Sequence, residues 1–302
     1  MKVFLYYRTY WGIDSKTGWL GKNILAKSKM EMVKTCINAM EFDKLDKSIE
    51  LHKIACVDNS TPDYTQHLER HFDEVFHTNE GLDVSDTVNG WIPLWGMKGG
   101  FIEVLKLIES RKYSPDDIIL IVEDDYLFRE NGLKDWINAC SHFEGFVTPY
   151  DHPYNYYRND MFLKIKGIEI FNDMHWRETT CNTGVVGGRY KFFKKTRIFR
   201  KIPRLVFGPI YLDRFLGREL PSVDVTFCRR IRKFSGVKLH SPMPGLAQHL
   251  SRWPNVSSKH MKVGYDTPLN ELSPGVDWEV RYKNVATLLA RVQKEIPIDG
   301  VK

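Results

Sequence analysis

Apolar residues gather in short continuous runs along the first half of the chain, and amphipathic stretches separate these runs. The runs lie at residues 3–7, 54–57, 74–76 and 118–122, and the amphipathic stretches at 25–40 and 101–110. The runs favour strands because most of their residues are β-branched or aromatic, whereas the stretches repeat apolar residues at helical spacing. This alternation predicts an α/β fold with a mostly parallel sheet, in which ligands bind beyond the carboxyl ends of the strands.

The second half of the chain is less regular and is richer in aromatic and basic residues. Its predicted elements are a strand at 183–186 and helices at 223–234 and 285–294. No Pro/Gly/Ser-rich linker divides the two halves, so we expect one continuous fold over residues 1–302, whose second half covers the mouth of the first.

Composition narrows the class of protein. The chain has 302 residues and is 42% hydrophobic, which allows a large core. It shows neither a transmembrane run nor a signal peptide, so we expect a soluble, cytoplasmic protein. The five cysteines form no CxxC pair, and we expect reduced thiols.

An acidic triplet, Glu123-Asp124-Asp125, directly follows the apolar run 118–122. Crowded carboxylates repel one another unless a cation lies among them, and Mg²⁺ or Mn²⁺ binds carboxylate and phosphate oxygens together. The triplet therefore predicts a metal and diphosphate site at a strand end. An acidic turn without a ligand is the simpler interpretation of the triplet alone.

Further polar or small-residue segments surround the triplet in the sequence. Before it stand Tyr6-Tyr7-Arg8-Thr9, Val57-Asp58-Asn59-Ser60 and Met97-Lys98-Gly99-Gly100; after it stand 181–188 (CNTGVVGG), 222–232 (SVDVTFCRRIR) and 242–249 (PMPGLAQH). In this order, the segments resemble the GT-A glycosyltransferases, particularly inverting enzymes related to family 2. The resemblance implies a GT-A fold, which is Rossmann-like with a mostly parallel sheet flanked by helices, and an irregular acceptor-side half.

The resemblance also implies a division of the chain and a donor site. Residues 1–125 are then the nucleotide-binding half, 126–250 the acceptor and catalytic half, and 251–302 a C-terminal extension. The residues implied to bind the nucleotide sugar are Arg8, Thr9, Asp58, Lys98, Glu123 and Asp124. A UDP-sugar is the default donor.

The metal implied by the resemblance is Mn²⁺ or Mg²⁺, held by a variant of the family's Asp-x-Asp (DXD) motif. Asp125 is the implied principal ligand and His249 an additional one. Asp224 matches the position of the general base in inverting members, where a carboxylate takes the proton of the acceptor hydroxyl. Helix capping by Asp224 is the simpler alternative.

Basic residues are concentrated in the segment 189–233 and account for the net charge of +6. Such a cluster favours an anionic partner, either DNA with a hydroxylated base, as in phage-type DNA glycosyltransferases, or a lipid-phosphate-linked glycan. A solvated basic loop and a neutral acceptor remain alternatives. Two other classes stay open: a nucleic-acid-binding module, and a metal-dependent phosphotransferase or nuclease on an α/β core.

Overall fold

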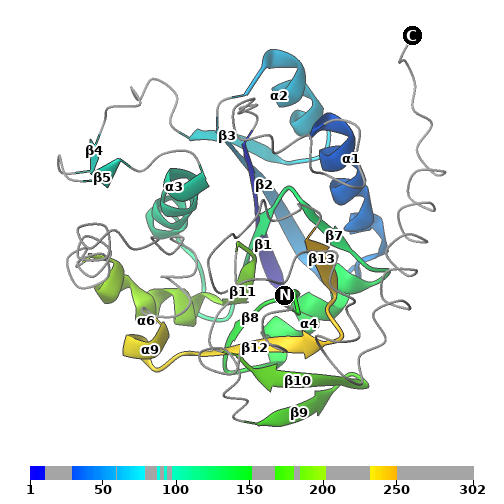
Figure 1. The fold of residues 1–302 in the computed structure, drawn as a ribbon, viewed down its shortest axis with the longest axis vertical. Helices are drawn as coiled ribbons and strands as arrows, with labels where there is room; N and C mark the ends of the chain where they lie inside the picture. Colours follow the sequence, from blue (N-terminus) through cyan, green and yellow to red (C-terminus); the bar gives the residue numbers. More distant parts are fainter. Residues whose placement is uncertain are drawn as a thin grey trace, which may run out of the picture.

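The computed structural model describes residues 1–10, 29–58, 60–78, 87–88, 92–93, 97–151, 167–179, 184–201 and 232–249 (Figure 1). The first half contains β1 (Lys2–Tyr10), α1 (Lys29–Ala39), the 3-10 helix η2 (Phe42–Lys44), β2 (Glu50–Asp58), α2 (Pro62–Glu69), β3 (Glu74–Thr78), β4 (Thr87–Val88), β5 (Ile92–Pro93), α3 (Met97–Ser110) and β6 (Ile118–Glu123). The second half contains β7 (Tyr126–Phe128), α4 (Gly132–His142), β8 (Gly145–Val147), β9 (Ile168–Phe171), β10 (Met174–Glu178), β11 (Val186–Arg189), α6 (Tyr190–Lys201), α9 (Arg232–Ser235), β12 (Lys238–Met243) and β13 (Ala247–His249).

One sheet of nine strands runs through both halves, in the order β3-β2-β1-β6-β11-β8-β12-β10-β9. The pairings β3–β2, β2–β1 and β1–β6 are parallel, as is β8–β12. Strands β11 and β10 run against their neighbours on both sides. The predicted α/β fold with a mostly parallel sheet flanked by helices is therefore confirmed.

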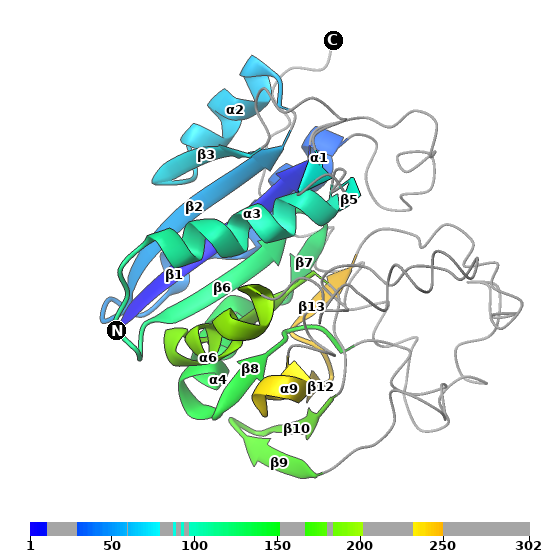
Figure 2. The same ribbon diagram turned by 90° about the vertical axis from the view of Figure 1, so that its left-hand side faces the viewer.

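Helices cover both faces of this sheet. Figure 1 shows α1, α2 and α4 on one side and α3, α6 and α9 on the other, and Figure 2 shows α3 lying over the sheet, against β1 and β2. The strands supply both cores, because successive side chains point to opposite faces. Leu5 and Leu120 join the core under α1, α2 and α4, whereas Tyr6, Ile119 and Ile121 join the core under α3 and α6.

The predicted elements of the first half agree with the structure in type and order, and most are a few residues longer than predicted. In the second half, the strand predicted at 183–186 begins instead at Val186 and continues to Arg189. Of the helix predicted at 223–234, the described part is α9, and the helix predicted at 285–294 lies outside the described residues. No described helix has the length and apolar composition needed to cross a membrane.

Candidate functional site

The carboxyl ends of β1 and β6 lie side by side. Between these two strands the connecting helices change from one face of the sheet to the other. From β1 the chain passes through α1 to β2 and through α2 to β3, with both helices on one face. It then crosses to the other side of β1 through α3, which packs on the opposite face. Open α/β sheets bind ligands beyond the strand ends at such a switch point. The acidic triplet follows β6 at this position.

Glu123 ends β6 and is neutralised by a cation of the neighbouring strand. Its carboxylate lies 2.8 Å from the guanidinium of Arg8, and Glu123 and Arg8 stand opposite each other in the parallel register. The Arg8 guanidinium also lies 5.4 Å from the centre of the Phe101 ring of α3. Because Arg8 is only 9% exposed, this ion pair and ring contact fix the end of β1 against β6.

Backbone of the small-residue segment before β11 packs against the other side of Glu123. Gly184 has a φ of +74°, and a Cβ built on it would meet the Glu123 carboxylate at 1.6 Å. Only glycine allows both this backbone conformation and this approach. The group that approaches this backbone most closely at Gly184 is therefore the carboxylate of Glu123.

Asp124 points to the opposite face and is held by α1. One carboxylate oxygen lies 2.5 Å from the ammonium of Lys29 and accepts a hydrogen bond from the hydroxyl of Thr9. The Thr9 hydroxyl is also hydrogen-bonded to the hydroxyl of Tyr64 in α2. Lys29 and Asp124 are largely buried, with side chains 18% and 10% exposed. The Asp124 carboxylate therefore links α1 and β1 directly, and α2 through the Thr9 hydroxyl.

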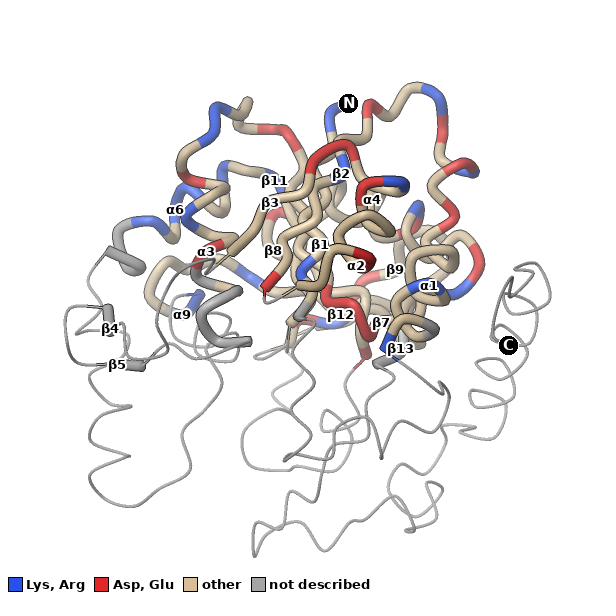
Figure 3. Tube along the Cα trace, turned by 90° about the horizontal axis from the view of Figure 1, so that it is seen from above, with Lys and Arg blue, Asp and Glu red and all other residues tan. Residues whose placement is uncertain are grey.

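Asp125 is buried at the turn between β6 and β7. Strand β13 pairs antiparallel with β7, and His249 stands opposite Tyr126, the residue after Asp125. Figure 3 shows acidic residues beside β7 and β13, away from the N-terminus. The structure thus brings the two predicted metal ligands to neighbouring chain positions, although the side chain of His249 lies outside what is described.

Two buried groups to which the sequence analysis assigned no role lie near Asp124 and Asp125. The hydroxyl of Tyr7 is fully buried and finds no hydrogen-bond partner among the described residues. Burial raises the pKa of Tyr7, and the charges of Asp124 and Asp125 contribute to this increase. Burial likewise raises the pKa of the Cys36 thiol of α1, with the same two aspartates contributing. Both groups therefore stay protonated beside the carboxylates.

The remaining nucleotide-binding predictions lie at the same edge of the sheet. Asp58 ends β2, is 8% exposed, and stands between Tyr10 of β1 and Thr78 of β3 in the register. Two strand spacings separate β2 from β6, which is about 10 Å. Lys98 lies in the first turn of α3, near the end of the helix that carries Phe101, but its side chain is outside the described part.

Not all predicted residues can be placed. Asp224 lies outside the described residues, as do residues 202–231 of the basic segment. Where the structure describes that segment, four cations are paired with acids: Arg189 and Lys191 with Glu144, Arg197 with Glu109, and Arg232 with Glu178. Part of the predicted positive charge is therefore neutralised within the protein.

A divalent cation suits the chemistry of this edge only if other ligands join Asp125 and His249. Within the described ranges, no group of three or more His, Cys, Asp or Glu side chains is placed to hold a metal. Mg²⁺ commonly binds through one or two carboxylates, with substrate phosphates and water as the other ligands. The residues present are compatible with that mode of binding and not with a cage built from protein ligands alone.

Comparisons with known proteins find distant structural likeness. No protein-family model matches the chain, and no curated protein matches it. Mouse xyloside xylosyltransferase 1 in its apo form is similar with a TM-score of 0.44 and 8% identity, covering 76% of this chain and 80% of that chain. The galactosyltransferase LgtC with donor and acceptor sugar analogues has a TM-score of 0.41 and 12% identity, covering 79% and 71%. The inositol-1-phosphate CTP transferase from T. maritima has a TM-score of 0.42 and 12% identity, covering 97% of each chain. This likeness is too distant to carry an argument about reaction or substrate.

Proposed function

We propose that the chain is a glycosyltransferase that binds a nucleotide-diphosphate sugar at the carboxyl edge of β1, β2 and β6. The observation that carries the proposal is the position of the acidic triplet at the switch point between β1 and β6. Asp58 ends β2 at the same edge, and we propose that it contacts a nucleoside lying across the strand ends. A nucleic-acid-binding module that catalyses no reaction would not need carboxylates on neighbouring strand ends.

Donor binding is proposed to involve Mn²⁺ or Mg²⁺ through Asp125 and His249. The bound cation would neutralise the diphosphate as it leaves. Glu123 and Asp124 are held by Arg8 and Lys29, so their first role in this proposal is to fix the turn that carries Asp125. A ribose contact from either carboxylate remains part of the proposal for the donor-bound state.

Transfer is proposed to invert the anomeric centre, with Asp224 as the base. Its carboxylate would accept the proton of an acceptor hydroxyl that attacks from the face opposite the diphosphate. The acceptor is proposed to be anionic, either a hydroxylated base in DNA or a lipid-phosphate-linked glycan, because basic residues are concentrated in 189–233.

Thermal denaturation with nucleotides tests the donor site. Mn²⁺ with UDP, at about 100 times the dissociation constant, should raise the Tm by about 5 °C. Asp125→Asn should remove most of this shift, since it takes away the principal metal ligand. Asp116→Asn is the matched control, because Asp116 is 79% exposed and lies before β6, at the opposite edge of the sheet.

The outcomes separate this proposal from the other reaction classes. If no nucleoside diphosphate shifts the Tm with the metal present, the proposed donor site is wrong. Release of pyrophosphate from a nucleoside triphosphate and a sugar phosphate would identify a nucleotidyltransferase instead. Asp224→Asn should keep the UDP shift and lose sugar transfer, and unchanged turnover would eliminate Asp224 as the base.

A further inference from the structure

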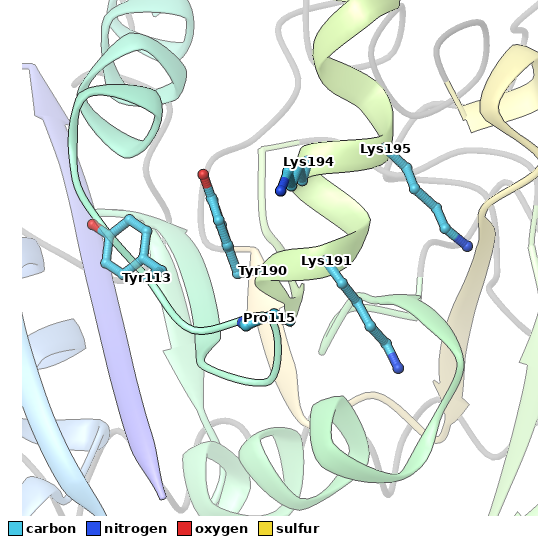
Figure 4. A pocket seen from close by; sticks show the side chains of 6 residues that line it. All are labelled: Tyr113, Pro115, Tyr190, Lys191, Lys194 and Lys195. Atoms are coloured by element: carbon cyan, nitrogen blue, oxygen red, sulfur yellow. The ribbon is translucent and has the colours of Figure 1, made fainter.

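A pocket of about 440 Å³ lies between the loop after α3 and the first turns of α6 (Figure 4). Its lining combines tyrosines with lysines and consists of Tyr113, Pro115, Tyr190, Lys191, Lys194 and Lys195. None of these residues belongs to the donor site proposed above. The volume is in the range that holds one ligand unit of nucleotide size.

The pocket lies at the end of the sheet opposite to the donor site. Strand β11 runs antiparallel to β6, and Arg189 stands opposite Ile118, the first residue of β6. The amides of Tyr190 and Lys191 donate hydrogen bonds to the carbonyls of Asp117 and Pro115, which fixes the start of α6 there. Five residues of strand, about 17 Å, separate this end from Glu123. From its start, α6 extends for 12 residues, which is about 18 Å.

The lysines of the pocket differ in their pairing. Lys191 pairs with Glu144, which it shares with Arg189. Lys194 and Lys195 are exposed, and neither makes an ion pair within the part of the chain that is described. Figure 3 shows basic positions along α6. Lys195 also lies over the Phe192 ring, with its ammonium 5.7 Å from the ring centre. Since that contact does not neutralise its charge, an anion from outside the protein can still pair with both ammonium groups.

The tyrosines supply a fixed aromatic surface beside the lysines. The rings of Tyr113 and Tyr190 lie 5.1 Å apart, and both side chains are half-buried. Tyr113 is anchored by a hydrogen bond to the Tyr6 hydroxyl and by an edge contact with the Phe4 ring at 4.6 Å. Basic residues interleaved with aromatic rings are typical of surfaces that bind single-stranded nucleic acid, where the rings stack on bases.

We infer that this pocket and the lysines of α6 bind a single-stranded nucleic-acid segment. A duplex keeps its bases stacked inside, out of reach of Tyr113 and Tyr190. A membrane surface is disfavoured because Phe192 and Phe193 of α6 are 3% and 0% exposed, so neither can insert into a bilayer. That the bound nucleic acid is the acceptor rests on the proposed function. In that case, the pocket holds the polynucleotide acceptor at a distance from the unit that receives the sugar.

Fluorescence anisotropy of the full chain with a labelled 20-nucleotide oligothymidylate tests the inference. Binding is measured without donor, so its outcome does not depend on the glycosyltransferase proposal. Lys194→Gln with Lys195→Gln should weaken binding and reduce the slope of log K against log salt by about 1.4, since each phosphate contact on a single strand contributes about 0.7. Tyr190→Leu should weaken binding about tenfold through lost stacking.

The control is Lys2→Gln with Lys238→Gln, which removes the same charge from side chains that are 54% and 60% exposed elsewhere on the surface. Equal losses in the two double variants would mean that net charge alone drives binding, and would overturn the inference. So would binding to duplex DNA or to phosphatidylserine vesicles in preference to the oligonucleotide, or no binding at all. The Lys194→Gln, Lys195→Gln variant should keep the rise in Tm with Mn²⁺ and UDP. This second measurement shows whether a loss of oligonucleotide binding concerns the pocket alone or also the donor site.

Discussion

Lys29 of α1 holds the turn that follows β6. Its ammonium lies 2.5 Å from the Asp124 carboxylate, and both side chains are largely buried. The ion pair ties α1 to this turn. The placement of Asp125, the next residue, therefore depends on a cation far away in the sequence.

Lys29→Met should lower the free energy of unfolding by about 1–3 kcal/mol, because it leaves a largely buried carboxylate without its counter-ion. Urea denaturation measures the loss. Lys29→Arg keeps the charge and should lose less. Adding Asp124→Asn to Lys29→Met should recover part of the stability, and a strictly additive double variant would contradict a direct interaction.

At the scale of residues, sequence patterns predict which carboxylates lie at the strand ends but not what holds them. Asp58 and the acidic triplet follow apolar runs, so parallel pairing brings them to one edge. Lys29 and Tyr7 carry no such signal, since their importance comes from contacts between distant elements. The functions assigned to Asp125, His249 and Asp224 stay predictions.

The elements that proved hardest to predict are short. The strands β8 and β11 have three and four residues, too few for a clear alternation of apolar and polar positions. The hairpin of β9 and β10 was not predicted. The residues of β9 are mostly exposed, so this strand lacks the alternation of buried and exposed positions that identifies a strand. By contrast, β6 is a continuous buried run of β-branched and apolar residues and was predicted to within one residue.

Strand β12 carries a histidine that makes stability depend on pH. Burial lowers the pKa of His240 to about 4, and its ring stacks on Phe143 at 4.4 Å. Between pH 6.5 and 4 the unfolded chain binds a proton that folded His240 does not. The free energy of unfolding should therefore fall by about 1–2 kcal/mol as the pH drops through this window.

Urea denaturation at a series of pH values measures this fall. His240→Phe keeps an aromatic ring against Phe143 and removes the titrating group, so its stability should change less between pH 6.5 and 4. Carboxylates that titrate near pH 4 affect both proteins alike. An identical pH profile for the two proteins would exclude His240 as the cause.

Over the whole molecule, the two proposed sites lie at opposite ends of one sheet. Nucleotide with Mn²⁺ should therefore slow amide hydrogen exchange at the carboxyl edge, in residues 8–10 and 123–128, by about tenfold or more. Exchange in residues 111–117 at the other edge should change little. Uniform slowing in both regions would indicate a global change in stability instead of local binding.

The architecture was more predictable than the placement of charge on it. Alternating strands and helices indicated the sheet and its ligand-binding edge, because local patterns record burial. The basic segment 189–233 was expected to bind an anionic acceptor. The register shows that its first residues lie at the far end of β6, a position that follows from the antiparallel pairing of β11 and not from any local pattern.

The alternation of side chains along β6 also bears on how this chain can evolve. Glu123 meets Arg8 beside α3, and Asp124 meets Lys29 of α1, because consecutive residues face opposite sides. Deleting one residue within 118–122 would exchange these directions and part both carboxylates from their cations. Descendants of this sequence can replace one apolar residue of the strand by another, but a change in its length breaks both pairs in a single step.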